Sequence, residues 1–160
     1  MNITDELVER INRSRPVPGG TAAPKLRVAI VACMDARINP NELFQLENGD
    51  AHIIRNAGGL VSDDVVRSLA VSQHRLGTRA IMVIQHADCG MQQVTEEEFT
   101  DQMAEFSGRT PSWRVGAFRD VEFSVRNSLE ALRTCPFLFT GEDIRGFVFD
   151  EKTGELREVH

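Results

Sequence analysis

The stretch LRVAIVACMDAR, residues 26–37, decides the fold. Its apolar run from Leu26 to Ala32 is nearly continuous rather than alternating, which is typical of a strand buried on both faces of a parallel sheet. Chemically reactive side chains begin where the run ends, with Cys33, Asp35 and Arg37. The stretch therefore predicts an α/β fold in which a central strand delivers a reactive cysteine to one edge of the sheet.

Strand and helix patterns alternate along the rest of the chain. Further strands are predicted at Ala51 to Arg55 and at Ala80 to Ile84. Helices are predicted from the Asn39 cap through Leu46, from Asp63 to Leu76 after the Ser62 cap, after the Thr95 cap, and from Phe118 to Arg133. Residues 147–149 and 156–159 are expected to close the chain as a strand pair. The pattern predicts a mostly parallel central β-sheet flanked by helices.

The N-terminal residues read as a helical arm on a linker. One apolar stripe consists of Ile3, Leu7, Val8 and Ile11, with Thr4 as the expected N-cap. Residues 13–24 are rich in proline and glycine and cannot be helical. We expect a single domain over 1–160, with residues 1–25 as arm and linker and 26–160 as the core. The stripe has to be buried either on its own domain or on a neighbouring subunit.

Two cysteines and a histidine follow the ends of predicted strands. Cys33 ends the first strand, and His86 and Cys89 follow the third. The carboxyl ends of parallel strands share one edge of a sheet, so these side chains are expected to converge. Thiolate and imidazole ligands suit Zn²⁺, and three protein ligands leave a fourth position for water or substrate. The sequence therefore predicts one Zn²⁺ per chain, with Asp35 and Arg37 as a catalytic pair beside it.

Three motifs in a fixed order resemble a known family. They are Cys-x-Asp-x-Arg at residues 33–37, Arg-Asn-Ala-Gly-Gly at residues 55–59 and His-x-x-Cys at residues 86–89. In these motifs the chain resembles the β-class carbonic anhydrases. The resemblance implies a lyase that hydrates carbon dioxide reversibly to bicarbonate and a proton through zinc-bound hydroxide. It also implies intertwined homodimers, alone or as a dimer of dimers.

The sequence departs from the family pattern at two places. Gln85 stands before the ligand histidine, where glycine is common, and Met34 and Ala36 stand where small hydroxyl residues are common. These changes alter the hydrogen bonding around the site and leave the reacting groups in place.

The role of Asp35 has two alternatives. Its carboxylate either coordinates zinc as a fourth ligand or pairs with Arg37 and leaves the fourth position open. We expect the open arrangement in the active form, because an arginine two residues away can form a bidentate pair with the carboxylate. Gly58 and Gly59 are either turn residues or positions where the backbone approaches a small substrate closely, and we expect them to bind substrate.

Two other functions remain open at this stage. Relatives on this scaffold hydrolyse carbon disulfide or carbonyl sulfide at the same zinc site. A zinc-binding regulatory module without turnover belongs to a different class, and the presence of Asp35 and Arg37 argues against it.

The composition of the chain excludes some classes of binding partner and indicates the cellular compartment. A net charge of −6 argues against nucleic acid or an anionic membrane as a partner. No apolar run is long enough to span a bilayer, and the N-terminus lacks the basic and apolar regions of a signal peptide. Three cysteines, two at ligand spacing, fit a reducing compartment, so a cytoplasmic protein is expected. The other candidates, Cys135, His52, His74 and His160, are expected to be structural or solvent-facing.

Overall fold

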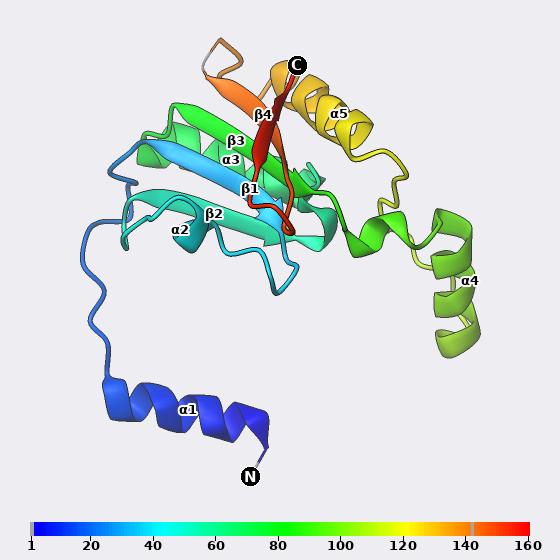
Figure 1. Cartoon of the computed structure of the whole chain (residues 1–160), viewed down its shortest axis with the longest axis horizontal. Coiled ribbons are helices and arrows are strands. Elements are labelled where there is room, and N and C mark those ends of the chain that lie inside the picture. The colour runs from blue at the N-terminus through cyan, green and yellow to red at the C-terminus, as the bar shows by residue number, and fades with distance from the viewer. Residues whose placement is uncertain (1, 142) are drawn as a thin grey trace.

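The computed structural model describes residues 2–141 and 143–160, and within these residues the centre of the molecule is a five-stranded sheet (Figure 1). The strands are β1 (Val28–Cys33), β2 (Ala51–Asn56), β3 (Ala80–His86), β4 (Ile144–Phe149) and β5 (Leu156–Val159). Their order is β2-β1-β3-β4-β5, with only the β4–β5 pair antiparallel among the described strands. The predicted mostly parallel sheet and C-terminal strand pair are confirmed.

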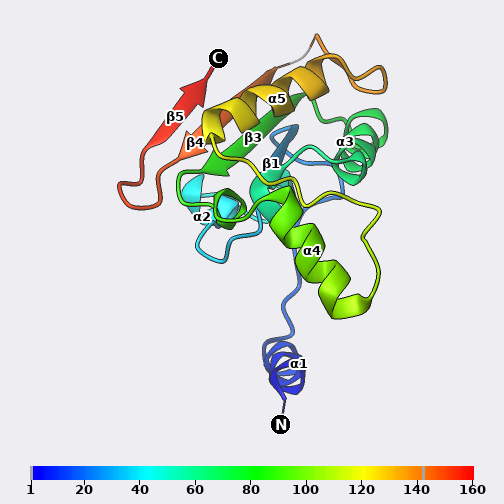
Figure 2. The same cartoon turned by 90° about the vertical axis from the view of Figure 1, so that its right-hand side faces the viewer.

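The helices are α1 (Ile3–Ser14), α2 (Pro40–Leu43), α3 (Asp63–Leu76), α4 (Glu96–Ser107) and α5 (Val121–Arg133). Short 3₁₀ turns follow β2 and β3 at Ala57–Gly59 and Gly90–Gln92. Helices α3 and α5 cover one face of the sheet (Figure 2). The opposite face, with Ile30 and Ile84 at its centre, is covered by Phe44 and Leu46. The central strand β1 is thus buried on both faces, which explains its unbroken apolar run.

Several predicted boundaries need correction. Helix α2 ends at Leu43 instead of continuing through Leu46, because Gln45 adopts φ 51° and turns the chain so that Leu46 reaches the sheet. Helix α5 begins at Val121 rather than Phe118, since the Asp120 carboxylate accepts backbone N–H groups and caps the helix.

The predicted starts of the first strand and of the linker also shift. Strand β1 begins at Val28 rather than Leu26, after Arg27 with φ 55°, and ends at Cys33 as predicted. Helix α1 continues through Ser14, so the first two residues of the predicted linker are helical. The cap of α1 is Asn2 rather than Thr4, because the Asn2 side chain accepts the N–H of Asp5 and closes a capping box.

Helix α1 stands apart from the sheet in both views (Figures 1 and 2). None of its described residues is buried, and the apolar stripe is more than half exposed at every position. The arm does not fold back on the sheet of its own chain. Met1, at the start of the predicted arm, lies outside the described residues. Among the helices that the structure describes, none has the length and apolar character to cross a membrane.

His52, His74 and Cys135, which lie outside the predicted site, have structural contacts, and His160 is exposed. The two ring nitrogens of His52 lie 2.7 Å from the Ser72 hydroxyl and from the Ala22 carbonyl, so this strand residue anchors the linker. His74 is exposed and bonds the Phe137 carbonyl at 2.8 Å. Cys135 is half-buried against the main core.

Candidate metal centre

The predicted ligands meet at the carboxyl edge of the sheet. Cys33 is the last residue of β1, His86 is the last residue of β3, and Cys89 follows three residues later. Because β1 and β3 are neighbours in the sheet, the two strand ends lie side by side. The sulfur atoms and a ring nitrogen of these three residues all lie within 4.8 Å of one another, and all three side chains are buried.

The arrangement fits zinc. The Cys33 and Cys89 sulfurs are 3.9 Å apart. Two thiolates bound to a tetrahedral zinc at the usual bond length of ~2.3 Å are separated by ~3.8 Å. Nε2 of His86 is buried, and within the described residues it has no hydrogen-bond partner, whereas Nδ1 faces Glu151. The unpartnered nitrogen and the two sulfurs are the donors that a zinc ion requires.

Asp35 is held by Arg37. Nε and Nη2 of Arg37 donate to the two carboxylate oxygens at 3.0 and 2.8 Å, and the Arg37 backbone N–H donates to Oδ1 at 2.9 Å. Oδ2 of Asp35 lies 3.8 Å from Nε2 of His86. The carboxylate therefore faces the donor cluster while both of its oxygens are occupied by the arginine.

Arg55 fixes the backbone between Cys33 and the Asp35–Arg37 pair. Its guanidinium donates to the carbonyls of Cys33 at 3.0 Å and Asp35 at 2.7 Å. The arginine comes from β2, whose register places Ala32 beside it. Arg55 belongs to the Arg-Asn-Ala-Gly-Gly motif, but no role for this residue follows from the sequence.

The electrostatics favour binding of a cation. The hydrogen bond from Cys89 lowers the pKa of Cys33 to about 4, although burial acts in the opposite direction. The same contact raises the pKa of Cys89 well above its usual range. Burial lowers the pKa of His86, but its interactions with Cys33 and Glu151 outweigh burial and the pKa is raised. The opposite shifts of the two cysteines mean that the pair holds on to one proton, which a cation bound between the sulfurs would displace.

The hydrogen bonds and charge of Arg37 hold the pKa of Asp35 well below the usual carboxyl range. The Asp35 carboxyl is therefore ionised at pH values around neutrality. An ionised carboxylate accepts hydrogen bonds and donates none.

The donor cluster opens into a depression of about 340 Å³. The lining residues are Cys33, Met34, Asp35, Ala36, Ala57, Gly58, Cys89, Gly90 and Met91. Apart from Asp35 and the two ligands, these residues offer apolar side chains and bare backbone. The depression suits a small, uncharged molecule.

Of the two glycines predicted to bind substrate, Gly58 lines the depression and Gly59 does not. Gly58 has φ 85°. Gly59 is buried with φ 63°, and a Cβ there would lie 2.9 Å from the backbone nitrogen of Cys33 and the carbonyl oxygen of Ile84. Gly59 thus has a packing reason to be glycine, and its predicted contact with substrate stays a prediction.

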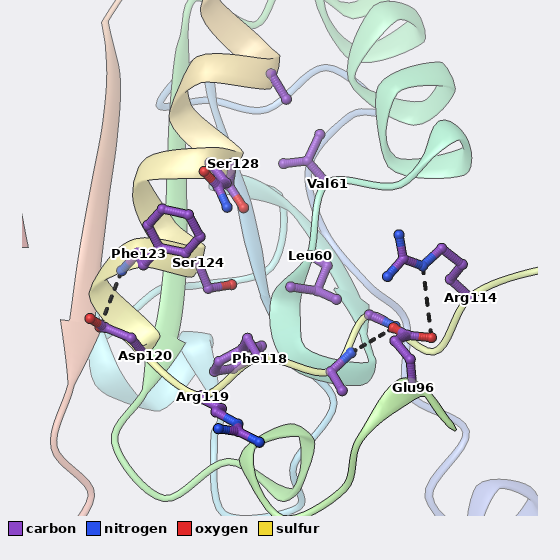
Figure 3. Close-up of a pocket in the computed structure, with 14 residues that line it drawn as sticks. Leu60, Val61, Glu96, Arg114, Phe118, Arg119, Asp120, Phe123, Ser124 and Ser128 are labelled. Atoms are coloured by element: carbon purple, nitrogen blue, oxygen red, sulfur yellow. Dashed lines mark hydrogen bonds and ion pairs between the residues drawn. The ribbon is translucent and has the colours of Figure 1, made fainter. Parts of the chain in front are cut away.

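A second, larger cavity of about 630 Å³ has a different set of lining residues (Figure 3). Figure 3 shows it between Leu60 and the start of α5, which contributes Phe123 and Ser124. A Cβ at Gly58 would touch both Leu60, which lines the large cavity, and Met91, which lines the metal depression. Gly58 thus lies between a residue of the large cavity and a residue of the metal depression, and the two cysteines line the depression.

The family model described as carbonic anhydrase matches residues 28–156. The chain belongs to the carbonic anhydrase family. The β-carbonic anhydrase 1 of Mycobacterium tuberculosis is 41% identical over 99% of both chains, which identifies the β class. The crystal structure of a carbonic anhydrase from Streptococcus mutans superposes with a TM-score of 0.92, at 38% identity, over 100% of this chain and 99% of that one.

A relative with a different printed activity is also similar. The carbon disulfide hydrolase of Saccharolobus solfataricus is 32% identical, over 84% of this chain and 78% of its own. The β-carbonic anhydrase scaffold of this chain is therefore shared with proteins named for another small, linear substrate.

The predicted residues of this β-carbonic anhydrase lie together, but one residue that contacts them was not predicted. Cys33, His86 and Cys89 converge as expected, with Asp35 beside them. Glu151, which contacts His86, has no motif to mark it. Its one available signal is its place two residues beyond the end of β4, at the same edge of the sheet as the ligands.

Gln85 replaces the glycine that is common before the ligand histidine. Its side chain is fully buried, and its amide nitrogen lies 3.4 Å from both the Gly59 carbonyl and the Ser128 hydroxyl. The amide therefore ties β3 to the turn at Gly59 and to α5. This departure changes the support of the site and leaves the donor atoms in place.

Proposed function

We propose that this β-carbonic anhydrase catalyses the zinc-dependent reversible hydration of carbon dioxide to bicarbonate and a proton. The observation that carries the proposal is the donor cluster of Cys33, His86 and Cys89 beside an Asp35 that Arg37 holds by both oxygens. Membership of the family and 41% identity to a named β-carbonic anhydrase support it.

The cluster would hold zinc through two sulfurs and Nε2 of His86. Zinc held there would supply Lewis-acid chemistry, lowering the pKa of a bound water as in the carbonic anhydrases with three histidine ligands. The protein supplies a site from which bulk water is largely excluded, since each ligand side chain is buried.

Asp35 orients the reacting water. Its carboxylate is ionised and faces the cluster, so it accepts a hydrogen bond from the water and directs the remaining lone pair toward the carbon atom of the substrate. Arg37 keeps the carboxylate in this orientation and away from the fourth metal position. The Asp35–Arg37 pair orients the reacting water and takes no proton from it. The proton that the reaction releases leaves to solvent.

The depression supplies the substrate pocket. Carbon dioxide is small and has no net charge, and Met34, Ala57 and Met91 offer it apolar walls. We assign the backbone at Gly58 to close approach of the substrate, because no side chain separates it from the depression. Gly59 contributes by letting the same turn pack against β1 and β3.

Hydrolysis of carbon disulfide is the second candidate. It is favoured by the 32% identity to a carbon disulfide hydrolase and by the apolar lining of the depression, which also suits a linear sulfur analogue. The higher identity and full-length coverage of the β-carbonic anhydrase relative place carbon dioxide first.

We also infer a homodimer, alone or as a dimer of dimers, and a cytoplasmic location. The exposed stripe on α1 supports the dimer, because an amphipathic helix of this length needs a surface on which to bury its apolar face. The two ligand cysteines support the location, because their thiols have to stay reduced to bind metal.

Stopped-flow measurement of carbon dioxide hydration by the zinc-loaded protein tests the main proposal. We expect hydration well above the buffer rate, and a much slower release of hydrogen sulfide from carbon disulfide. A zinc-loaded, folded protein that does not accelerate hydration contradicts the proposal. Rapid release of hydrogen sulfide with slow hydration selects the second candidate.

A further inference from the structure

One carboxylate outside the predicted site, that of Glu151, faces His86 of the donor cluster. Glu151 follows β4 in the turn that leads to β5. Phe149, two residues earlier, pairs in register with His86 at the end of β3. This pairing brings Glu151 alongside the ligand histidine, although they are distant in sequence.

A single oxygen of Glu151 contacts two parts of the site. Oε1 lies 3.3 Å from Nδ1 of His86 and accepts the backbone N–H of Asp88 at 3.1 Å. The same oxygen is 3.5 Å from Nη2 of Arg37. Glu151 thus connects the histidine ligand, the segment just before Cys89 and the arginine that holds Asp35.

Burial makes the position of this carboxylate costly for the fold. The Glu151 side chain is 7% exposed. Its second oxygen, Oε2, is buried and has no hydrogen-bond partner among the described residues. A buried carboxylate with one unsatisfied oxygen destabilises a fold unless another requirement keeps it there. Its contact with the metal-facing histidine provides that requirement.

The contact with Glu151 also indicates which ring nitrogen of His86 carries the hydrogen. A carboxylate can only accept the hydrogen bond in this contact, so Nδ1 of the neutral ring carries the hydrogen and donates it, and Nε2 keeps a lone pair. Nε2 is the nitrogen that is buried without a partner in the described structure. Ligand histidines whose second nitrogen donates to a carboxylate bind their metal more tightly, and loss of such a partner typically weakens binding 10–100-fold.

We propose that Glu151 is a positioning residue of the metal centre, which holds His86 in the Nδ1–H tautomer with Nε2 toward the metal and anchors the segment that carries Cys89. The inference rests on the zinc site of the proposed function. Glu151 touches neither the substrate depression nor the donor sulfurs, so it acts through His86 and the Asp88 backbone.

The test measures zinc affinity by competition with a chelator in Glu151→Ala, Glu151→Gln and Glu155→Ala. Glu155 is the matched control, because it is an exposed glutamate in the same turn. We expect Glu151→Ala to bind zinc about 10–100-fold more weakly, and Glu151→Gln to recover much of the loss because its amide oxygen still accepts a hydrogen bond. Glu155→Ala should match the parent. Parent-like affinity in folded Glu151→Ala overturns the proposal.

A second measurement needs no change at Glu151. Long-range ¹H–¹⁵N spectra of the zinc-loaded parent report which nitrogen of each of the four histidines carries a proton, and the signals missing in His86→Ala identify His86. We expect the proton on Nδ1 of His86. A metal-bound Nδ1 overturns the proposal even if Glu151 variants misfold. Both measurements are independent of turnover, so a protein that binds zinc as expected but does not hydrate carbon dioxide contradicts only the proposed function.

Discussion

Arg37 binds both carboxylate oxygens of Asp35, Nε to Oδ1 at 3.0 Å and Nη2 to Oδ2 at 2.8 Å. A third bond, from Nη2 to the Asp88 carbonyl at 3.0 Å, fixes the arginine to the segment that carries Cys89. The pair is half exposed on the arginine side, so it adds little to stability. Its consequence is orientation, because the carboxylate is fixed in place before any substrate arrives.

Replacing Asp35 by Asn should therefore separate catalysis from metal binding. Zinc content should stay at the parent value, because the ligands are unchanged, while hydration should fall roughly 100-fold or more. The reason is that the amide no longer presents two acceptor oxygens to the arginine and the water. Stopped-flow assay and elemental analysis measure the two effects. Hydration at the parent rate would show that Asp35 has no catalytic role.

Arg37→Ala tests the other half of the pair. Without the arginine, Asp35 is free to approach the metal, so we expect zinc to be retained and hydration to be inhibited most at low pH, where hydroxide competes least for the metal. A rate profile across pH is the measurement. A uniform loss at all pH values would argue that Arg37 only orients the carboxylate.

The ligand assignment predicts the metal content of four variants. Cys33→Ser, His86→Ala and Cys89→Ser should each lose most of the zinc, because three ligands are few enough that none is redundant. Cys135→Ser is the control, since this half-buried cysteine packs against the core away from the cluster. Elemental analysis of purified proteins decides the matter, and full occupancy in Cys33→Ser would refute the assignment.

Zinc affinity should rise with pH. The two cysteines share a proton in the folded site, because their contact raises the pKa of Cys89 while it lowers that of Cys33, and zinc has to displace this proton. Each displaced proton makes the association constant rise about tenfold per pH unit. Calorimetry in buffers of different ionisation enthalpy counts the protons. An affinity that is flat between about pH 6 and 8 would contradict this picture.

Gly59→Ala should destabilise the fold more than Gly77→Ala. Both glycines have positive φ, 63° and 78°, so either alanine costs about 1–2 kcal/mol of backbone strain. At Gly77 a Cβ meets nothing within 4 Å, whereas at Gly59 it lies 2.9 Å from backbone atoms of β1 and β3. We expect Gly59→Ala to lose at least about 1 kcal/mol more of unfolding free energy. Urea denaturation measures it, and equal losses would remove the packing argument.

The arm should control assembly. Deleting residues 1–21 removes the helix whose apolar stripe is exposed in the single chain. We expect weaker association and lower hydration activity together, measured by light scattering and stopped flow at micromolar concentration. A matched control is Glu9→Ala, on the same helix and exposed, which should leave both unchanged. A fully active monomer would contradict the proposed homodimer.

The sheet and the convergence of Cys33, His86 and Cys89 are predictable from sequence, because the strand pattern is local and the carboxyl ends of parallel strands share one edge of the sheet. The continuous apolar run before Cys33 requires burial on both faces, and the alternation with helices requires parallel neighbours. His86 and Cys89 are close in sequence, so one turn brings them to the same ion. Helix ends were less predictable, since α2 stops where Phe44 and Leu46 find the sheet, a contact that no local pattern encodes.

By itself, then, the sequence determined the strands, the edge of the sheet at which Cys33, His86 and Cys89 gather, and the expectation that Arg37 pairs with Asp35. Only the tertiary structure decided which nitrogen of His86 faces the cluster, that Arg55 donates to the backbone carbonyls beside it, and that Glu151 faces His86. The physical reason is that hydrogen bonds depend on orientation to a few tenths of an ångström. That orientation is set by strand order and register, here by β4 lying beside β3, and segments far apart in the chain have no sequence signal for it.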